Sequence, residues 1–514
     1  MSTPSDQTAE TWPAAGWRAM AGVLAALAAV GVGHGLAAVW NPVASPLLAV
    51  GSALIDAAPT PAKEFAVRTF GTNDKPILIG SIGVALLVLA AGLGLIAWGH
   101  RRIALAGISM LGFAGLAAAV ARGAARDGLP SLAAGVVGIA VMHALTALSA
   151  QDAGGDSGRG GNRRRFLAGL GAAAALATAG GAGGMLLDRS RRMARAARRA
   201  IGLPAPSSPA AAIPAGAQIE PMTPFVTPAD DFYRVDISLV TPRIDATGWS
   251  LRIDGMVDRP LTLSYDDLLK LPLIERTITL TCVSNEVGGP YVGNATWLGV
   301  PFSEIISRVG VRSGVDQVYS YSSDGGYTCS TPYQAVSDGR DAMIVVGMNG
   351  QVLPDAHGFP ARMLVPGLFG FVSATKWLER IEFTTYARRS AYWTDRGWAK
   401  DAPILTQSRI DVPASLATLP RNKPVIAGVA WAQHRGIAKV EIRIDGGPWR
   451  QTRLAADAGV DLWRQWSYVY DGPAGLHSAQ VRATDLTGDT QPEARTRVFP
   501  SGARGWHEIQ FTAE

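Results

Sequence analysis

The sequence predicts a protein of three parts: an N-terminal transmembrane α-helical bundle, a central α+β domain and a C-terminal immunoglobulin-like β-sandwich. Long apolar runs fill the first third of the 514 residues, and they approach the roughly 20 residues that a helix needs to cross a bilayer. Short strand and helix patterns then mix in the middle of the chain. Strand patterns separated by Asp- and Gly-rich turns occupy the last part, as in a sandwich. The expected boundaries are 1–187 for the membrane anchor, 188–221 for a linker, 222–402 for the central domain and 403–514 for the sandwich.

Five apolar runs are each expected to cross the membrane as a helix, namely 17–40, 76–98, 103–121, 130–149 and 166–187. The shorter stretch 43–58 contains Pro46 and is expected to be an interfacial segment or a loop. Basic residues such as Arg101 and Arg102 place the N-terminus inside and everything after residue 187 outside. The arginines just after residue 188 conflict with this orientation, because the positive-inside rule would keep them in the cytoplasm.

An export signal would resolve this conflict. Asn-Arg-Arg-Arg-Phe-Leu at 162–167 resembles a twin-arginine export motif, with Arg163, Arg164, Phe166 and Leu167 in the matching places. The motif lacks the usual Ser or Thr before the arginines and the Lys after Leu167, so an ordinary basic flank of a membrane helix is the alternative. Because the motif stands where a large soluble part begins, we expect a multi-pass cell-membrane protein whose soluble part lies outside the cytoplasm.

The distribution of charge argues against a nucleic-acid partner. Residues 1–200 carry 18 Lys and Arg against 9 Asp and Glu in a chain of net charge +6, so the remainder is net acidic. A haem within the helices is also not expected. His34 lies about 25 Å from the inner start of its span and His143 about 10 Å from the inner end of its own, so one haem cannot join them. The helices are therefore expected to serve as an anchor.

Apolar alternation and turn residues predict the individual elements of the soluble part. In the central domain, strands are expected at 249–253, 277–281, 318–321, 342–346 and 362–365, with helices at 265–270 and 302–309. In the sandwich, strands are expected at 439–444, 463–470 and 479–483. No cysteine pair lies in this last part, which excludes only the disulfide-bonded antibody form.

Cys282 stands where an alternating strand runs into the polar, glycine-rich turn Val-Ser-Asn-Glu-Val-Gly-Gly. A thiolate held at a strand end suits a soft ligand of a transition metal. Taken alone, however, this cysteine is more typical of a buried core thiol, or of a disulfide with Cys329. The motifs around Cys282 are needed to distinguish a metal ligand from a buried thiol or a disulfide.

Several stretches in the region 222–512 together resemble the sulfite oxidase family of molybdenum-pterin enzymes. They are Phe-Tyr-Arg at 232–234, Leu-Thr-Cys-Val-Ser-Asn at 280–285, Ala-Thr-Trp-Leu-Gly-Val at 295–300, Ser-Ser-Asp-Gly-Gly at 322–326, Met-Asn-Gly-Gln-Val-Leu-Pro at 348–354, His-Gly-Phe-Pro-Ala-Arg-Met-Leu-Val-Pro-Gly at 357–367, Lys-Trp-Leu at 376–378 and Asp-Gly-Gly-Pro-Trp at 445–449. Each stretch is weak alone, but together they follow the order of the family. The resemblance implies that Cys282 is the only protein ligand of molybdenum, and that Cys329 is a buried thiol.

The resemblance also implies a site for the molybdenum-molybdopterin cofactor. A pterin with a dithiolene and a phosphate needs a thiolate for the metal, and cations and hydrogen-bonding groups for the rest. The implied cofactor-binding residues are Tyr233, Arg234, Asn285, Asp324, His357, Arg362, Thr375 and Lys376, and the implied catalytic residues are Cys282, Arg234 and Trp398. Singly, Asp324 and Asn285 are equally typical of turns, and Lys376 of a solvated strand end.

Two positions depart from the animal and plant members of the family. Those enzymes continue with arginines after the asparagine that follows the metal ligand, whereas this chain has Glu286, so one cation for an oxyanion is replaced by an acid. Trp398 stands about where those enzymes keep an active-site tyrosine, and a tryptophan can donate a hydrogen bond but cannot act as an acid. Arg234, with Arg396 as a weaker candidate, remains for binding an anionic substrate.

The expected function is that of a membrane-anchored oxidoreductase with an extracytoplasmic catalytic domain. By resemblance, it transfers an oxygen atom to or from a small sulfur or nitrogen oxyanion or oxide, and it exchanges electrons with an external cytochrome or quinone-linked partner. A homodimer through the C-terminal domain is also implied. Two alternatives stay open: an S- or N-oxide reductase of the same superfamily, for example for methionine sulfoxide, and a non-enzymatic membrane protein that displays an immunoglobulin-like module.

Overall fold

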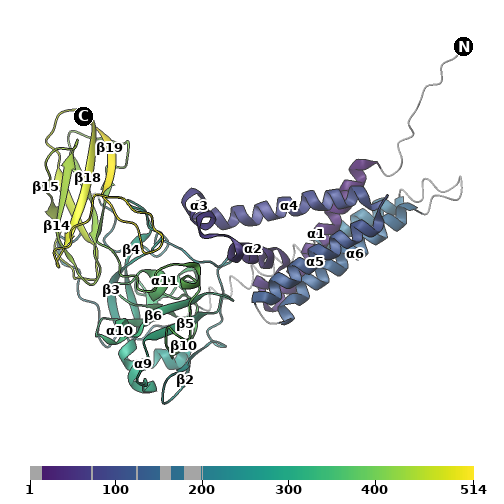
Figure 1. Ribbon diagram of the computed structural model, residues 1–514, viewed down its shortest axis with the longest axis horizontal. Helices are drawn as coiled ribbons and strands as arrows, with labels where there is room; N and C mark the ends of the chain where they lie inside the picture. Colours follow the sequence, from purple (N-terminus) through teal and green to yellow (C-terminus); the bar gives the residue numbers. More distant parts are fainter. Residues whose placement is uncertain are drawn as a thin grey trace, which may run out of the picture. The chain divides into compact units, whose positions relative to one another are not determined.

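The structure, a computed structural model, describes residues 14–70, 73–122, 125–150, 164–178, 198, 201–220 and 222–514. The chain divides into two compact units, a helical unit of residues 1–195 with 237–240, and a second unit of residues 196–236 and 241–514. In Figure 1 the described part of the first unit consists of the purple and blue helices, and the second is built mainly from the teal, green and yellow strands. Each unit is described by itself below.

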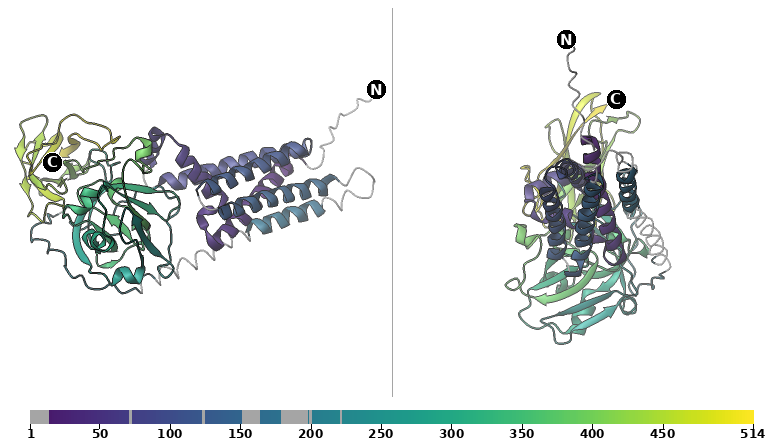
Figure 2. Two further views of the ribbon diagram at one scale, coloured as in Figure 1. Left: turned by 60° about the horizontal axis from the view of Figure 1, so that its bottom comes forward. Right: turned by 90° about the vertical axis from the view of Figure 1, so that its right-hand side faces the viewer.

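The helical unit is a bundle in which α1, α4, α5 and α6 run alongside one another (Figure 2). Its elements are α1 (Ala15–Trp40), η1 (Pro42–Ala44), α2 (Pro46–Ala57), α3 (Thr60–Phe70), α4 (Asp74–Ala97), α5 (Arg101–Arg122), η3 (Ala125–Gly128) and α6 (Leu129–Ala150), and residues 164–178 are also helical. Among the described residues, four stretches are long and apolar enough to cross a membrane: Ala15–Val39, Asp74–Ala97, Arg101–Arg122 and Ala125–Leu148. These agree with the first four expected spans.

One expectation for this unit is wrong, and another falls partly outside the described residues. The prediction of a loop within 43–58 is wrong, because α2 is helical and Pro46 occupies its first turn, where a missing N–H costs no hydrogen bond. Of the fifth expected span, residues 166–178 are helical, whereas 179–187 and Arg163 of the export motif lie outside the described residues.

The outer surface of the bundle is apolar. Side chains on α4, α5 and α6 that are 59–70% exposed include Val84, Val88, Met110, Phe113 and Val136. Water-soluble proteins rarely expose apolar surface on several neighbouring helices, whereas lipid tails solvate it well. The helical unit is thus suited to a membrane.

Small residues allow these helices to approach closely. A side chain on Gly22 of α1 would overlap the Ala90 carbonyl oxygen of α4, and one on Gly94 would overlap the Arg18 carbonyl oxygen. On the other side of the bundle, a Cβ on Gly112 of α5 would lie 3.0 Å from the Cα of Gly135 on α6. Close backbone contact at small residues is the usual means of packing helices in lipid, where no hydrophobic effect drives them together.

The central part of the second unit contains two sheets and short helices. One sheet has the order β2 (Leu261–Ser264), β1 (Ser250–Gly255), β10 (Leu378–Thr384), β5 (Gln317–Ser322), β6 (Thr328–Pro332). The other has the order β3 (Ile274–Thr281), β4 (Val292–Pro301), β7 (Met343–Met348), β8 (Gln351–Val352), and β9 (Arg362–Leu364) also pairs with β7. The helices are α8 (Tyr265–Leu269), α9 (Phe302–Val309), α10 (Tyr333–Ser337), α11 (Gly370–Ser373), η4 (Asp355–His357) and η5 (Thr394–Arg396). The expected strands and helices of this part are confirmed to within a few residues.

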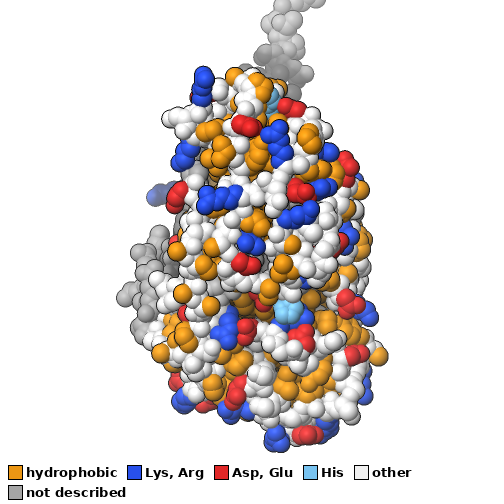
Figure 3. Space-filling model, turned by 90° about the vertical axis from the view of Figure 1, so that its left-hand side faces the viewer, with side chains coloured by type: hydrophobic (Ala, Val, Ile, Leu, Met, Phe, Trp, Pro, Cys, Tyr) orange, Lys and Arg blue, Asp and Glu red, His pale blue; other side chains and the backbone are white. Residues whose placement is uncertain are grey.

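The C-terminal part is rich in sheet. One sheet has the order β11 (Gln407–Val412), β13 (Val425–Trp431), β17 (Arg464–Val469), β16 (Arg453–Leu454), and the other has the order β12 (Thr418–Leu419), β19 (His507–Ala513), β18 (Gly475–Asp485), β14 (Ile437–Ile444), β15 (Arg450–Gln451). The two sheets share an apolar core that includes Ile426, Trp466, Val481 and Phe511. The three strands expected from the sequence are confirmed. On the face shown in Figure 3, acidic and basic side chains are interspersed.

The C-terminal part holds the end of β3 in place. Gln433 Nε2 donates to the Thr279 carbonyl oxygen at 3.1 Å and to Thr281 Oγ1 at 3.0 Å, and the Trp463 N–H donates to Thr279 Oγ1 at 2.8 Å. Along the same edge of the strand, residues 201–220 run beside its start, where the Glu275 N–H donates to the Ser208 carbonyl oxygen at 2.8 Å. The strand end is therefore fixed by residues far away in the sequence.

The glycine contacts lead to a prediction about the bundle. Gly94→Val should lower the thermal unfolding midpoint of the full chain in detergent, because overpacking of this kind costs about 1–3 kcal/mol. The matched control is Gly92→Val on the same helix, where a Cβ meets open space. Equal midpoints for the two variants would contradict the contact between α1 and α4.

Candidate functional site

Cys282 directly follows β3 and begins the turn expected from the sequence. Its N–H donates to the Tyr291 carbonyl oxygen at 3.0 Å, and the Ser284 N–H points at its Sγ from 3.4 Å. The residue is half-buried, and desolvation by the surrounding protein raises the pKa of its thiol. Cys282 and Cys329 are both free, and Cys329 Sγ instead contacts the Phe371 carbonyl oxygen at 3.2 Å. The alternative of a disulfide between them is therefore wrong.

Asn285 lies in the same turn and has an unused donor. Its N–H donates to the Cys282 carbonyl oxygen at 3.0 Å, and its Oδ1 accepts from the Tyr291 N–H at 2.7 Å. Its Nδ2 is buried and has no hydrogen-bond partner among the described residues, in a side chain that is 2% exposed. An unpaired buried donor costs about 1–3 kcal/mol, so a bound acceptor at this position would remove a real penalty.

Arg362 on β9 is a buried cation without an acid. Its guanidinium donates only to carbonyl oxygens, those of His357 at 3.2 Å, Met363 at 3.4 Å and Ala374 at 3.4 Å, and it stacks 5.2 Å from the Trp297 ring. Within the described chain, no carboxylate forms an ion pair with it. The side chain is 6% exposed, and burial lowers its pKa to about 10. A buried charge in this state favours an anionic partner.

Two segments that carry predicted site residues lie side by side. The Trp377 N–H donates to the Gly358 carbonyl oxygen at 3.2 Å, and the Met363 N–H donates to the Thr375 carbonyl oxygen at 2.9 Å. A Cβ on Gly358 would lie 3.0 Å from the Cα of Lys376, so the close approach of the two segments requires glycine there. Lys376 is thereby brought next to the segment that carries His357 and Arg362.

His357 is buried and neutral. Its Nε2 lies 2.7 Å from the Ala229 carbonyl oxygen, which can only accept, so Nε2 carries the proton and Nδ1 is left as an acceptor. Burial lowers the pKa of His357 to about 4, with Arg362, Lys376 and Arg234 as further causes. The Phe232 ring packs edge-on against it at 5.6 Å.

One carboxylate joins two of the predicted cations. Asp236 Oδ2 accepts from Lys376 Nζ at 2.7 Å and from Arg234 Nε at 3.0 Å. The Asp236 side chain is 4% exposed, whereas that of Arg234 is 34% exposed. The bond to Asp236 uses only Nε of Arg234, and its two terminal nitrogens have no hydrogen-bond partner among the residues described. These two N–H₂ groups form a fork that suits an oxyanion.

Two phenols complete the surroundings of the thiol. Burial and the nearby Cys282 raise the pKa of Tyr233, and burial raises that of Tyr327 well above its usual value, so both remain neutral donors. Tyr327 donates from its hydroxyl to the Phe371 carbonyl oxygen at 3.2 Å, and its N–H donates to Asp324 Oδ1 at 3.1 Å. Asp324 thus shapes a turn, as one of the alternatives for it supposed, and the same turn brings Tyr327 to the site.

The remaining predicted residues are Thr375, Trp398, Arg396 and Glu286. Thr375 is fully buried and its Oγ1 bonds Ser320 Oγ at 2.7 Å. Trp398 packs against Phe371, Trp393 and Phe499, with ring centroids 5.3–5.9 Å apart, and its buried Nε1 has no partner in the described structure. Arg396 stacks on Tyr392 and donates to the carbonyl oxygen of that residue at 2.8 Å. Glu286 is exposed.

Sequence reasoning missed Asp236 and Tyr327. Asp236 stands two residues after Arg234, a spacing at which successive side chains of an extended segment share a side. Tyr327 stands three residues after Asp324, beyond an Asp-Gly-Gly turn. Both spacings were visible in the sequence, but neither carries a signal strong enough to single out the residue.

The donor set fits a molybdenum-pterin cofactor. The acid-free Arg362 and the unpaired Asn285 Nδ2 both call for an anionic group rich in acceptors, and the Cys282 thiol supplies a soft metal ligand. Tyr233 and Tyr327 offer further neutral hydrogen-bond donors close to the thiol. Among the described residues, no carboxylate forms an ion pair with Arg362 that would take the place of such an anion.

Similarity to known proteins agrees with this fit. A family model described as an oxidoreductase molybdopterin binding domain matches residues 238–393. Sulfite oxidase of Gallus gallus is 27% identical over 322 residues, which cover 54% of this chain and 70% of that protein. The mitochondrial sulfite oxidase of Rattus norvegicus is 26% identical, covering 55% of this chain and 61% of that protein. The NADH nitrate reductase of Solanum lycopersicum is 27% identical, covering 52% of this chain and 36% of that protein.

The chain spans less than two thirds of the length of the nitrate reductase and of the rat enzyme. Among solved structures, the sulfane dehydrogenase SoxCD from Paracoccus pantotrophus matches 56% of this chain with 23% identity and a TM-score of 0.48, and 82% of that chain is covered. Because the matched domain is that of oxidoreductases, a purely non-enzymatic display protein is set aside. Residues 238–393 thus match an oxidoreductase molybdopterin binding domain, which implies a molybdenum-pterin cofactor, and this part of the chain is similar to the sulfite oxidases.

Proposed function

We propose that this protein transfers an oxygen atom to or from a small sulfur or nitrogen oxyanion, or an oxide, outside the cytoplasm. The observation that carries the proposal is a buried, acid-free Arg362 and a half-buried free Cys282 thiol that both interact with Tyr233, together with the unpaired Asn285 donor in the turn of that thiol. When bound, the molybdenum-pterin group supplies two-electron oxygen-atom transfer. The protein side chains bind and orient that group and the substrate.

We assign roles to the residues from their contacts. Cys282 gives up its proton to ligate the metal, since the thiolate is the ligating form. Arg362 and Lys376 would hold the phosphate end of the cofactor, with support from Thr375, which directly precedes Lys376. Asn285, through Nδ2, and His357, through Nδ1, bond the pterin, one as a donor and the other as an acceptor. Asp324 places Tyr327, which with Tyr233 lines the site as a neutral donor.

Arg234 is the substrate-binding candidate. Its terminal nitrogens are the one partly exposed guanidinium fork in this cluster, and Asp236 fixes its Nε. Trp398 has a free indole N–H that is suited to donating one hydrogen bond to substrate or cofactor. The named relatives are sulfite oxidases and nitrate reductases, so sulfite and nitrate are the first oxyanions to test.

A second candidate is reduction of a neutral S- or N-oxide such as methionine sulfoxide. Glu286 favours it, because this exposed acid follows Asn285 where the animal and plant enzymes carry cations. A carboxylate close to the entrance repels an anion more than a neutral oxide.

We also propose the setting in which the enzyme works. The five predicted helices anchor residues 1–187 in the cell membrane, and the motif at 162–167 exports the folded part from 188 onward, with the catalytic domain over 222–402. The part from 403 to 514 is an immunoglobulin-like sandwich that forms a homodimer. Electrons pass to or from an external cytochrome or quinone-linked partner. The four long apolar helices support the anchoring, and the paired sheets with a common core support the sandwich.

The metal content of two cysteine variants tests the cofactor assignment. Produced with cofactor biosynthesis, the wild-type protein should contain about one molybdenum per chain, measured by elemental analysis. Cys282→Ser should lose most of the oxygen-atom transfer activity, because a hydroxyl is a poor substitute for a soft thiolate. Cys329→Ser is the matched control and should retain both the molybdenum and the activity. A Cys282→Ser protein with full metal content and full activity would contradict the assignment.

Substrate assays decide between the two candidate reactions. The holoenzyme with artificial electron carriers should turn over sulfite or nitrate, and Arg234→Gln should raise KM for the anion at least tenfold, because a charge-assisted bond is worth about 1.5–3 kcal/mol. Turnover of methionine sulfoxide or an N-oxide, with a KM that Arg234→Gln leaves unchanged, would select the reductase instead. If the holoenzyme turned over none of these compounds, both candidate reactions would be contradicted.

Asp236→Asn tests whether the cations of the site face a bound anion. Removing the carboxylate from two cations should destabilise the cofactor-free protein by about 3–5 kcal/mol, and the loaded protein by less, because there the cofactor anion replaces the carboxylate. The readout is the rise in unfolding temperature on cofactor loading, which should be larger in Asp236→Asn than in wild type.

Asp254→Asn is the control for this prediction. Asp254 is also buried and also accepts from two arginines, Arg252 and Arg380, on the sheet formed by β1 and β10. Its loss should lower the unfolding temperature of the loaded and the cofactor-free protein equally. If Asp236→Asn behaved in the same way, Arg234 and Lys376 would not be cofactor contacts.

A further inference from the structure

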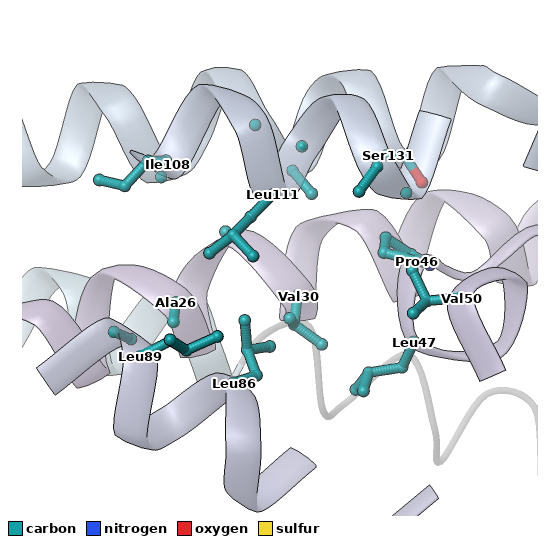
Figure 4. Close-up of a pocket in the computed structure, with 18 of the residues that line it drawn as sticks. Ala26, Val30, Pro46, Leu47, Val50, Leu86, Leu89, Ile108, Leu111 and Ser131 are labelled. Atoms are coloured by element: carbon teal, nitrogen blue, oxygen red, sulfur yellow. The ribbon is translucent and has the colours of Figure 1, made fainter. Parts of the chain in front are cut away.

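Polar side chains, rather than apolar space, indicate where this protein can act on a substrate. The helical unit has a pocket of about 310 Å³, and its labelled residues are apolar apart from Ser131 (Figure 4). The Ser131 hydroxyl is buried against Gly115, so the residues described around this pocket offer no accessible polar side chain. In the central domain, three aromatic side chains carry a donor that could meet a substrate: Tyr233, Tyr327 and Trp398.

Two of these three donors are poorly placed for a substrate. Trp398 Nε1 is buried, and the rings of Phe371, Trp393 and Phe499 pack around the indole with centroids 5.3–5.9 Å away. The Tyr327 hydroxyl already donates to the Phe371 carbonyl oxygen at 3.2 Å. A phenol with a free hydroxyl would suit a polar substrate better than either.

Tyr233 has such a hydroxyl, which forms no hydrogen bond with any residue that the structure describes. The residue is half-buried, and its hydroxyl, unlike the donors of Ser131 and Trp398, is not closed off from solvent. A donor without a protein partner can bond a ligand without first breaking a bond within the protein.

The Tyr233 hydroxyl lies close to the thiol. A Cβ on Gly370, the first residue of α11, would stand 3.9 Å from Tyr233 Oη and 3.9 Å from the Thr281 carbonyl oxygen. The hydroxyl and the residue before Cys282 therefore border the same small space, which the missing side chain of Gly370 leaves open. Cys282 and Arg362 both act on the pKa of Tyr233, in opposite directions, so both charges lie within range of the phenol.

The ring of Tyr233 is held in place, and its hydroxyl stays protonated. Phe232 stacks on the ring at 5.1 Å with an interplanar angle of 23°, and Tyr291 tilts against it at 6.4 Å. Burial is the main cause that raises the pKa of Tyr233, so the phenol keeps its proton and remains a donor. Arg234 follows directly with its partly exposed guanidinium fork. Two adjacent residues can thus offer a cation and a neutral donor.

We propose that Tyr233 is a catalytic residue whose Oη–H donates a hydrogen bond to an oxygen atom of the bound substrate. Tyr233 then supplies the phenol that position 398 lacks, where animal and plant members of the family keep an active-site tyrosine. The same bond serves an oxyanion held by Arg234 and a neutral oxide, since both present an acceptor oxygen. This assignment rests on the proposed oxygen-atom transfer.

Tyr233→Phe in the holoenzyme tests the assignment. At unchanged molybdenum content, its kcat/KM should fall at least about tenfold for an oxyanion, or about fivefold for a neutral oxide, because one hydrogen bond is lost. If wild type is active and Tyr233→Phe has the same kcat/KM, the assignment alone is overturned. Loss of molybdenum with an unchanged kcat/KM per metal would also overturn it, because the hydroxyl would then be a cofactor contact. A wild-type holoenzyme without turnover would contradict the oxygen-atom transfer itself.

Unfolding of the cofactor-free protein gives a readout that is independent of turnover. Tyr233→Phe should leave the unfolding temperature unchanged, because the hydroxyl that it removes has no partner in the protein. Tyr319→Phe is the matched control. Tyr319 is 7% exposed and its hydroxyl donates to the Ser390 carbonyl oxygen at 3.1 Å, so this variant should unfold at a lower temperature yet keep its kcat/KM. An equal drop for Tyr233→Phe would show that its hydroxyl bonds the protein, and would overturn the assignment.

Discussion

The position of Cys282 depends on the restraint of the end of β3 from both sides. Within the sheet, β4 pairs with β3 along its whole length as far as Thr281. From outside the sheet, Gln433 binds the carbonyl oxygen of Thr279 and the hydroxyl of Thr281, and Arg409 donates to the Gly289 carbonyl oxygen at 2.8 Å. A Cβ on Gly288 would collide with the His507 ring, and its φ of +80° is favourable only for glycine. The C-terminal part therefore has a mechanical role in the site: it fixes the strand and turn that present the thiol.

The site contains more cationic than anionic side chains. Arg362 and Lys376 are both largely buried, and Arg234 is partly so, yet Asp236 is the one carboxylate that bonds any of them in the described structure. Burial penalises the charge of Arg362 and lowers its pKa to about 10. An anionic cofactor restores the balance, so its binding energy is drawn partly from the relief of this penalty. Burial keeps Tyr233 and Tyr327 neutral by raising the pKa of each phenol, and burial together with the nearby cations keeps His357 neutral by lowering its pKa.

Much of the fold was predictable, because periodicity reports which side of an element is buried. Strands such as 318–321 and the helix at 302–309 were placed to within a few residues, and the first four apolar spans agree with long helices. The helix α2 was missed because Pro46 was taken to break a helix that it begins. For the site, the sequence indicated Cys282, Arg362, Lys376 and His357 by motif, whereas Asp236 could not be found. Its role depends on Lys376, which is 140 residues away along the chain, and no local pattern encodes a contact of that kind.

An unpaired donor marks the candidate site of the central domain better than the apolar pattern does. Asn285 Nδ2 is buried where the described fold provides no acceptor, a state that costs free energy unless a ligand supplies one. Trp398 Nε1 shares this property, yet it is surrounded by Phe371, Trp393 and Phe499, whose ring faces accept an N–H weakly. An orphaned donor is therefore a strong indication of a ligand only when other groups around it also lack a partner. Asn285 meets this condition, because it stands in the turn of Cys282, whose free thiol interacts with Lys376 and Tyr233, and Tyr233 also interacts with the acid-free Arg362.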